Sequence, residues 1–246
     1  MVNLDIFNNN FNIAIFGKTN SGKTVLLKYL LMAIRNRFQH VFMIIGSKTS
    51  YTSNNYWQFI YPDNTLFLDD KINVKESIKN FTKKILTWSA NNDHRKLVIF
   101  DDIGDKSRDC LDNFTNECRH GIISTIFLVH AYKHLDTTTR YSLTHIIITP
   151  NLAETDEILK TKKDLVCSMK NIWKKAGDIK VYIIYDMNSS IYYLTVPEHL
   201  NVISDSLYVL TTEGPYKDDL INIKSNIDMI NMYQNTDDNV SELVSY

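Results

Sequence analysis

The sequence is poor in cysteine, and no apolar stretch approaches the roughly 20 residues that a membrane-spanning helix needs. Its three cysteines, Cys110, Cys118 and Cys167, are odd in number and form no C-x-x-C pair, which suits a reducing compartment. The Asn-rich start lacks a basic region followed by an apolar one. We therefore expect no secretory signal and an intracellular protein.

The chain also carries little net charge and little glycine. A formal net charge of -1 argues against a protein that coats nucleic acid over its whole surface, although a local basic patch remains compatible with it. The length of 246 residues suits one large α/β domain with ample surface to bury. Because there are only seven glycines, a glycine-containing motif is hard to obtain by chance.

One such motif is present, between an apolar run at 11–16 and helical spacing over 24–31. It matches the phosphate-binding pattern G-x-x-x-x-G-K-T at Gly17, Lys18, Thr19, Asn20, Ser21, Gly22, Lys23 and Thr24. The two glycines would let backbone N–H groups approach a phosphate chain closely. Lys23 would reach the β- and γ-phosphates, and the Thr24 hydroxyl would ligate Mg²⁺. The sequence therefore predicts a nucleotide site.

An acidic pair follows a second apolar run. Leu97 to Phe100 end in Asp101 and Asp102, which is typical of a central parallel strand with carboxylates at its C-terminal edge. We expect Asp101 to hold Mg²⁺ through its water shell and Asp102 to orient or deprotonate the attacking water. A solvated acidic turn is the alternative, and the upstream P-loop favours catalysis. The apolar run at 122–129 ends in His130, whose side chain would face the γ-phosphate as a sensor.

The remaining pattern predicts an α/β chain with a C-terminal β-hairpin. Further strands are expected at 41–45, 65–68 and 146–149, helices at 73–90 and 109–119, and the hairpin at 181–185 and 191–195. The aromatic segment 46–63 is expected to pack against the domain edge rather than to stack on bases. We divide the chain into a domain over 1–212 and an acidic helix and tail over 213–246.

A basic segment lies inside the first of these parts. Residues 160–180 hold seven lysines against two aspartates, which would suit phosphate contacts on DNA or equally a solvated helix.

Together, these residues resemble the poxvirus-type DNA packaging ATPases, the A32-like branch of the FtsK-HerA class that is shared with other large DNA viruses. The resemblance covers about residues 11–195 and rests on an ordered set of motifs. Besides the P-loop these are Asp101-Asp102-Ile103-Gly104-Asp105-Lys106, Arg119-His120, Tyr132-Lys133-His134, and Arg140 ahead of Leu143-Thr144-His145.

The resemblance implies an α/β P-loop NTPase: a three-layer α/β/α sandwich with a mostly parallel sheet of the additional-strand, RecA/FtsK-HerA-like type. It implies a ring of five or six subunits that hydrolyses ATP with Mg²⁺ and drives double-stranded DNA into a preformed capsid. Capsid or portal proteins would be its partners. Its place would be the viral factory in the host cytoplasm, or the virion.

The resemblance also assigns roles by position. Asp101 would be the Mg²⁺-associated acid and Asp102 the catalytic one, where many relatives of the wider class use glutamate. Arg119 would be the arginine presented to a neighbouring subunit's γ-phosphate, with Arg140 as a second candidate. His130 occupies the sensor position, which is commonly glutamine in this class.

Two other functions compete with a DNA motor. A GTPase-type switch is suggested by D-x-x-G at 101–104 and T-K-x-D at 161–164, although the acidic motif lies far downstream of the P-loop and the second motif follows a helix-like stretch. The other alternative is a virion assembly component that binds nucleotide without appreciable turnover.

Overall fold

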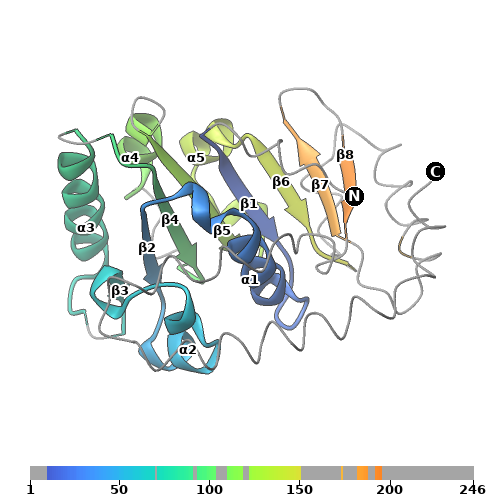
Figure 1. The fold of residues 1–246 in the computed structure, drawn as a ribbon, viewed down its shortest axis with the longest axis horizontal. Coiled ribbons are helices and arrows are strands. Elements are labelled where there is room, and N and C mark those ends of the chain that lie inside the picture. The colour runs from blue at the N-terminus through green and yellow to red at the C-terminus, as the bar shows by residue number, and fades with distance from the viewer. Residues whose placement is uncertain are drawn as a thin grey trace.

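A computed structural model describes residues 10–69, 71–90, 93–103, 110–118, 122–150, 173, 182–187 and 192–195 of the chain. In these residues, one eight-stranded sheet forms the centre of the molecule and helices cover both of its faces (Figure 1). The acidic segment 213–246 and nearly all of the basic segment 160–180 lie outside the described residues.

The sheet is parallel except at one edge. Its strands follow the order β3-β2-β4-β5-β1-β6-β7-β8, in which β6–β7 and β7–β8 pair antiparallel and every other pair is parallel. The strands are β1 Asn12–Phe16, β2 His40–Ile45, β3 Thr65–Phe67, β4 Lys96–Asp101, β5 Ile123–Val129, β6 His145–Ile148, β7 Tyr182–Asp186 and β8 Tyr192–Thr195. The predicted mostly parallel sheet and its C-terminal hairpin are therefore confirmed.

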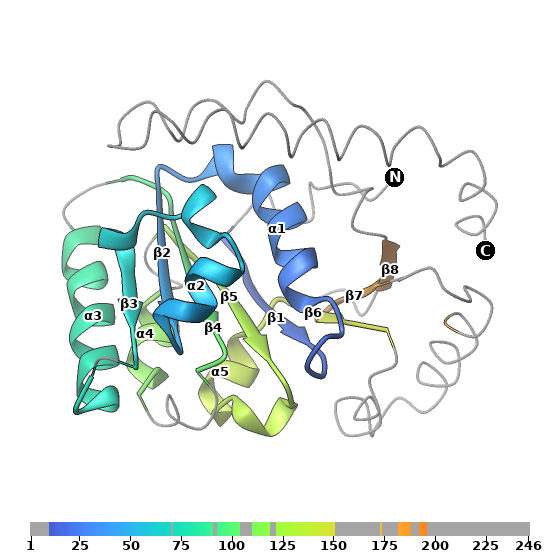
Figure 2. The ribbon, with the colours of Figure 1, turned by 90° about the horizontal axis from the view of Figure 1, so that it is seen from below.

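The helices form the two outer layers. They are α1 Lys23–Ile34, α2 Lys48–Ser53, α3 Val74–Ser89, α4 Asp112–Cys118 and α5 Thr137–Ser142. Short 3₁₀ turns are η2 Arg35–Arg37, η3 Tyr56–Gln58, η4 Pro62–Asn64 and η6 Tyr132–His134. In Figure 2, α1 and α2 lie on one side of the sheet and α4 and α5 on the other. This is the expected three-layer sandwich, with α5 as a helix that the sequence pattern did not predict.

Local side chains begin several of these helices. Asn73 accepts a hydrogen bond from the Glu76 N–H at the start of α3, and Asp136 accepts one from the Thr139 N–H at the start of α5. Such N-cap bonds satisfy backbone donors that have no partner inside the helix. The predicted helix at 109–119 begins later, at Asp112.

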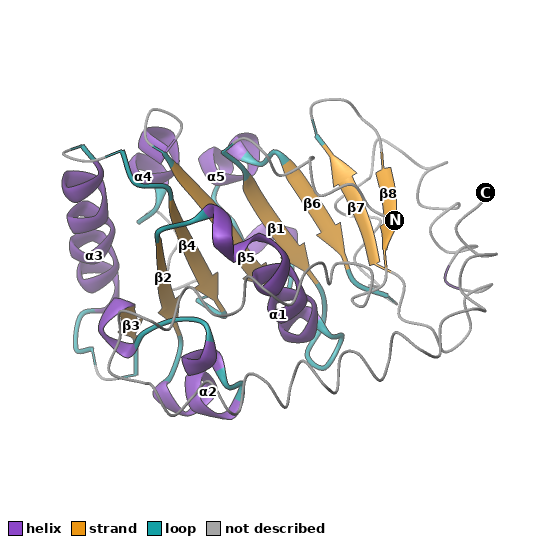
Figure 3. Ribbon diagram, viewed as in Figure 1, coloured by secondary structure: helices purple, strands orange, loops and turns teal. Residues whose placement is uncertain are grey.

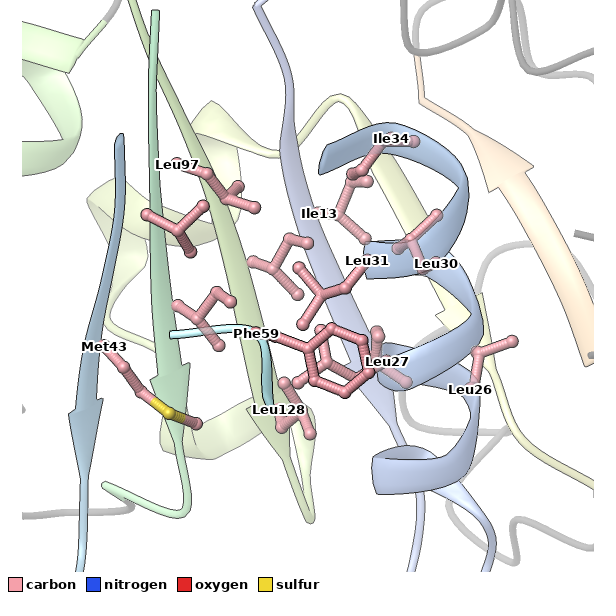
Figure 4. Close-up of a cluster of buried hydrophobic side chains, with 14 of the residues drawn as sticks. Ile13, Leu26, Leu27, Leu30, Leu31, Ile34, Met43, Phe59, Leu97 and Leu128 are labelled. Carbon is pink, nitrogen blue, oxygen red and sulfur yellow. The ribbon is translucent and has the colours of Figure 1, made fainter. Parts of the chain in front are cut away.

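The sheet separates two apolar cores because neighbouring residues on a strand face opposite sides. On β1, Ile13 and Ile15 belong to the cluster beneath α1, whereas Ala14 and Phe16 belong to the cluster beneath α3, α4 and α5. Figure 4 shows the α1 side, where leucines of the helix pack against β1, β4 and β5. The labelled residues are Ile13, Leu26, Leu27, Leu30, Leu31, Ile34, Met43, Phe59, Leu97 and Leu128.

Strand β5 lies between β1 and β4, which is the additional strand that the resemblance implied. Phe16 pairs with Val129, and Asp101 pairs with Leu128, so the C-terminal ends of the three strands are level. The arrowheads of the parallel strands point to the same edge in Figure 3. The loops that follow β1, β4 and β5 therefore meet at one edge of the sheet. In the ranges that the structure describes, no helix is both long and apolar enough to cross a bilayer.

Candidate nucleotide-binding site

The P-loop connects β1 to α1, as predicted, and its backbone requires its glycines. Gly22 has φ +93°, and Asn20, the other positive-φ residue of the loop, has φ 62°. Asparagine tolerates this left-handed region better than most residues. A Cβ on Gly17 would lie 2.2 Å from both the Ser21 Oγ and the Thr149 Oγ1. The loop is therefore compact, and larger residues at the glycine positions would clash.

The loop also meets a side chain from the far strand β7. The Tyr182 hydroxyl donates a hydrogen bond to the Gly22 carbonyl at 3.2 Å, and a Cβ on Gly22 would lie 2.2 Å from the same hydroxyl oxygen. Tyr182 is fully buried. The sequence predicted a hairpin here and no contact with the P-loop.

The Lys23 side chain folds back over the loop. Its Nζ donates to the Gly17 carbonyl at 2.6 Å and to the Lys18 carbonyl at 2.9 Å. Burial lowers the pKa of the Lys23 ammonium, and the nearby charges of Asp101 and Asp102 oppose that effect. The cation is thus held at the mouth of the loop, next to both acids.

Asp101 lies at the end of β4 on the α1 side of the sheet and is 7% exposed. Its Oδ2 accepts a hydrogen bond from the Tyr56 hydroxyl at 2.8 Å. Burial is the main cause that raises the pKa of Asp101 to about 6, and the charge of Asp102 also raises this pKa. The hydrogen bond from Tyr56 and the charges of Lys23 and His130 act in the opposite direction. The carboxylate is therefore largely ionised at pH 7.

Asp102 leaves the strand in a different direction from Asp101. Its φ of 52° breaks the alternation of β4, and its side chain is 69% exposed. The Asp102 Oδ1 lies 3.2 Å from the His130 Nε2. The two acids therefore have different environments, one buried and one solvated, as separate roles would require.

His130, at the end of β5, reaches both halves of the site. Besides its contact with Asp102, its Nδ1 lies 3.2 Å from the Gly17 carbonyl oxygen and 3.3 Å from the Lys23 Nζ. Because β5 lies between β1 and β4, this histidine is placed between the P-loop and the acidic pair.

Of the two predicted arginines, Arg119 lies outside the residues that the structure describes. Arg140, in α5, donates from its Nε to the Asp136 carbonyl at 3.3 Å and from Nη2 to the Thr137 hydroxyl at 3.1 Å, and its guanidinium lies over the Tyr132 ring at 5.2 Å. For both arginines, the role of contacting a neighbouring subunit's γ-phosphate stays a prediction.

The residues fit a nucleotide with Mg²⁺. The P-loop precedes a helix of 12 residues, whose N-terminus favours an anion. Among the described residues, the Ser21 Oγ and the Thr149 Oγ1 are buried at the loop without a hydrogen-bond partner. Thr24 and Asp101 supply hydroxyl and carboxylate oxygens, the ligand types that Mg²⁺ prefers. Gly17 to Thr24 would hold the phosphates, and Thr24 and Asp101 would hold the metal.

Tyr56 is the main residue that sequence reasoning missed. The aromatic segment 46–63 was expected to pack against the domain, and the burial of Tyr51 and Tyr56 confirms this. What the pattern did not reveal is that one of these rings carries a hydroxyl to the acid of the site. A tyrosine in a loop gives no signal of such a long-range bond.

Known proteins match this chain in sequence. A family model described as "Poxvirus A32 protein" matches residues 3–214. The "DNA packaging protein OPG160" of variola virus is 30% identical over 144 residues, covering 55% of this chain and 51% of that protein. The vaccinia virus (strain Copenhagen) protein of the same name is 25% identical over 192 residues, covering 72% and 69%. The matched part of the chain thus spans about half the length of the variola relative.

The fold also matches solved structures. The genome packaging NTPase B204 from Sulfolobus turreted icosahedral virus 2 in complex with sulfate has a TM-score of 0.55 at 14% identity, covering 76% of this chain and 97% of that one. The same protein in complex with ATP-gammaS has a TM-score of 0.51 at 16% identity, with the same coverage. At this level of identity the likeness shows that the fold is shared.

Proposed function

The chain belongs to the poxvirus A32 protein family, and on this premise we propose that it is an ATP-hydrolysing motor that moves double-stranded viral DNA into the capsid during virion assembly. The names of the variola and vaccinia relatives, which are DNA packaging proteins, support the cargo. The genome packaging NTPase B204, which has the same fold and was solved with ATP-gammaS, supports ATP as the nucleotide.

The observation that carries the enzymatic part is the meeting of three strand ends. The P-loop follows β1, the acids end β4, and His130 ends the strand between them. Phosphoryl transfer demands positioning and charge stabilisation more than covalent chemistry, and this edge supplies both. The Lys23 Nζ lies 3.3 Å from the His130 Nδ1, and the His130 Nε2 lies 3.2 Å from the Asp102 Oδ1.

Each side chain then has a role. Bound Mg²⁺ would neutralise charge on the β- and γ-phosphates. Lys23 would transfer its bonds from the two loop carbonyls to phosphate oxygens. The exposed carboxylate of Asp102 would accept a hydrogen bond from the attacking water and align it. The His130 Nε2–H would donate to Asp102 and fix the direction of its carboxylate.

The active form is proposed to be a ring of five or six subunits. In such a ring, an arginine from a neighbouring subunit would relieve the γ-phosphoryl charge and couple hydrolysis to ring movement. Arg119 is our first candidate and Arg140 the second. Capsid or portal proteins would be the docking partners, and the viral factory or the virion would be the place of action.

The test is steady-state hydrolysis of ATP and of GTP by the purified protein, with and without double-stranded DNA, beside Asp102→Asn. Asp63→Asn, which removes an exposed carboxylate in η4, is the matched control. We expect ATP turnover that DNA stimulates, that Asp102→Asn abolishes and that Asp63→Asn leaves intact. Guanine-selective turnover without DNA dependence would instead support the switch. Tight nucleotide binding without turnover would support the assembly component.

A further inference from the structure

Tyr56 occupies an unusual position for a core aromatic residue. It lies in η3, between β2 and β3, is fully buried on the α1 side of the sheet, and directs its hydroxyl to the Asp101 Oδ2 at 2.8 Å. Alternation on β4 places Asp101 on this same side, with Leu97 and Ile99. The phenol therefore holds one of the two carboxylate oxygens of the buried acid.

The Tyr56 hydroxyl also shares a side-chain hydrogen bond with Thr24. Burial and the Asp101 carboxylate raise the pKa of the Tyr56 phenol, and the bond with Thr24 lowers it. Tyr56 therefore contacts both Thr24 and Asp101, and it donates its hydroxyl hydrogen to Asp101.

These two bonds join the residues that the proposed function assigns to Mg²⁺. We propose that Tyr56 is a positioning residue of the metal site, whose buried hydroxyl donates to the Asp101 Oδ2 and so fixes the direction of that carboxylate beside Thr24. The second oxygen of Asp101 is thereby left for the cation and its water. This inference rests on the proposed Mg²⁺-nucleotide binding and adds a residue to it.

A purely structural tyrosine would behave differently, and the chain offers one for comparison. Tyr51 is buried in the same cluster, its ring centroid lies 6.5 Å from that of Tyr56, and its hydroxyl donates to the backbone carbonyl of Ile60. Tyr51→Phe and Tyr56→Phe each remove one buried hydroxyl from the same packing environment. Only the second removes a bond to a metal-site residue.

The experiment measures the affinity of a fluorescent ATP analogue for wild type and both variants, with excess Mg²⁺ and with EDTA. For Tyr56→Phe we expect the affinity gain from Mg²⁺ to fall by about 10- to 100-fold, the range seen when partners of metal ligands are removed. The affinity in EDTA should stay within about threefold, since the P-loop contacts are unchanged. Tyr51→Phe should keep the full gain. Electron paramagnetic resonance of Mn²⁺ bound with ADP gives the metal affinity without turnover.

A double variant covers the case in which Tyr56→Phe folds poorly because it leaves the Asp101 carboxylate without its partner. In an Asp101→Asn background, Tyr56→Phe should change the Mg²⁺ gain much less than in wild type, because the shared bond is already altered. Three results would overturn this inference and leave the proposed function intact. They are a Tyr56→Phe variant with the full Mg²⁺-dependent gain in affinity, a Tyr51→Phe variant that loses as much of this gain, and an equal effect of Tyr56→Phe in the Asp101→Asn background. A wild type whose nucleotide binding ignores Mg²⁺ would overturn the proposed function as well.

Discussion

The His130 Nε2 lies 3.2 Å from the Asp102 Oδ1, and the opposite nitrogen of the same ring faces the P-loop. With a proton on Nε2, the ring donates to Asp102, and its Nδ1 then accepts from Lys23 when neutral or donates to the Gly17 carbonyl when charged. In either state, one side chain connects the acid expected to align water with the loop expected to hold phosphate.

His130 should therefore affect turnover more than binding. We expect His130→Ala to lower the ATP hydrolysis rate by about 10²-fold, in line with the loss of one positioned donor, with ATP affinity changed by no more than about threefold. His130→Gln keeps an amide N–H donor and should retain most of the rate. The check is kcat beside equilibrium binding for both variants. Full turnover in His130→Ala would remove the sensor assignment.

Lys23 should matter for binding itself. Its ammonium lies at the mouth of the P-loop, where it donates to the Gly17 and Lys18 carbonyls. We expect Lys23→Ala to weaken ATP binding by at least about 10²-fold, since a charge-assisted bond in a half-buried site is lost. Lys71→Ala, which removes an exposed lysine between β3 and α3, is the control and should bind nearly as wild type. Equal affinities for both variants would contradict the expected phosphate contact.

The two arginines can be separated by mixing subunits. Arg119→Ala should leave nucleotide binding intact and slow turnover in the assembled ring by about 10³-fold or more if it acts in trans. Arg140→Ala should cost little turnover, because Arg140 bonds within α5 and stacks on Tyr132. Adding Lys23→Ala subunits, which keep Arg119, should restore part of the rate of Arg119→Ala. If only the Arg140→Ala ring lost activity, the two assignments would be exchanged.

Asp101 should make folding stability depend on pH. Its folded pKa is raised to about 6 from 3.8, so between these values the folded state binds more protons than the unfolded one. The free energy of unfolding therefore falls as pH rises through this window. The loss amounts to roughly 3 kcal/mol at most and is fully present above pH 6. Asp101→Asn should therefore unfold at higher urea than wild type at pH 8, with the gap closing near pH 4. If the difference in urea midpoint between Asp101→Asn and wild type were equal at both pH values, the raised pKa of Asp101 would not be its cause.

The succession of strands along the chain, the P-loop and the acidic pair follow from local signals. Apolar runs of five or six residues bounded by polar ones mark buried parallel strands, and the residues that end them are visible in the sequence. The positions of Gly17 to Thr24, of Asp101 and Asp102, and of His130 at the ends of their strands were predicted on that basis and are confirmed. Their chemical roles stay predictions until tested. The helix α5 was missed because its six residues are too short to show a period.

The sequence by itself determined the α/β fold class, and it showed which residues form the P-loop and which ones end the neighbouring strands. It could do so because strand periodicity and the glycine motif are local properties of the chain. Only the tertiary structure decided that Tyr56, from the segment between β2 and β3, bonds to Asp101, and that Tyr182, from β7, bonds to the P-loop. Both tyrosines read as ordinary core residues in sequence. Hydrogen bonds between residues 45 and 160 positions apart depend on how strands and loops pack in space, which no local pattern records.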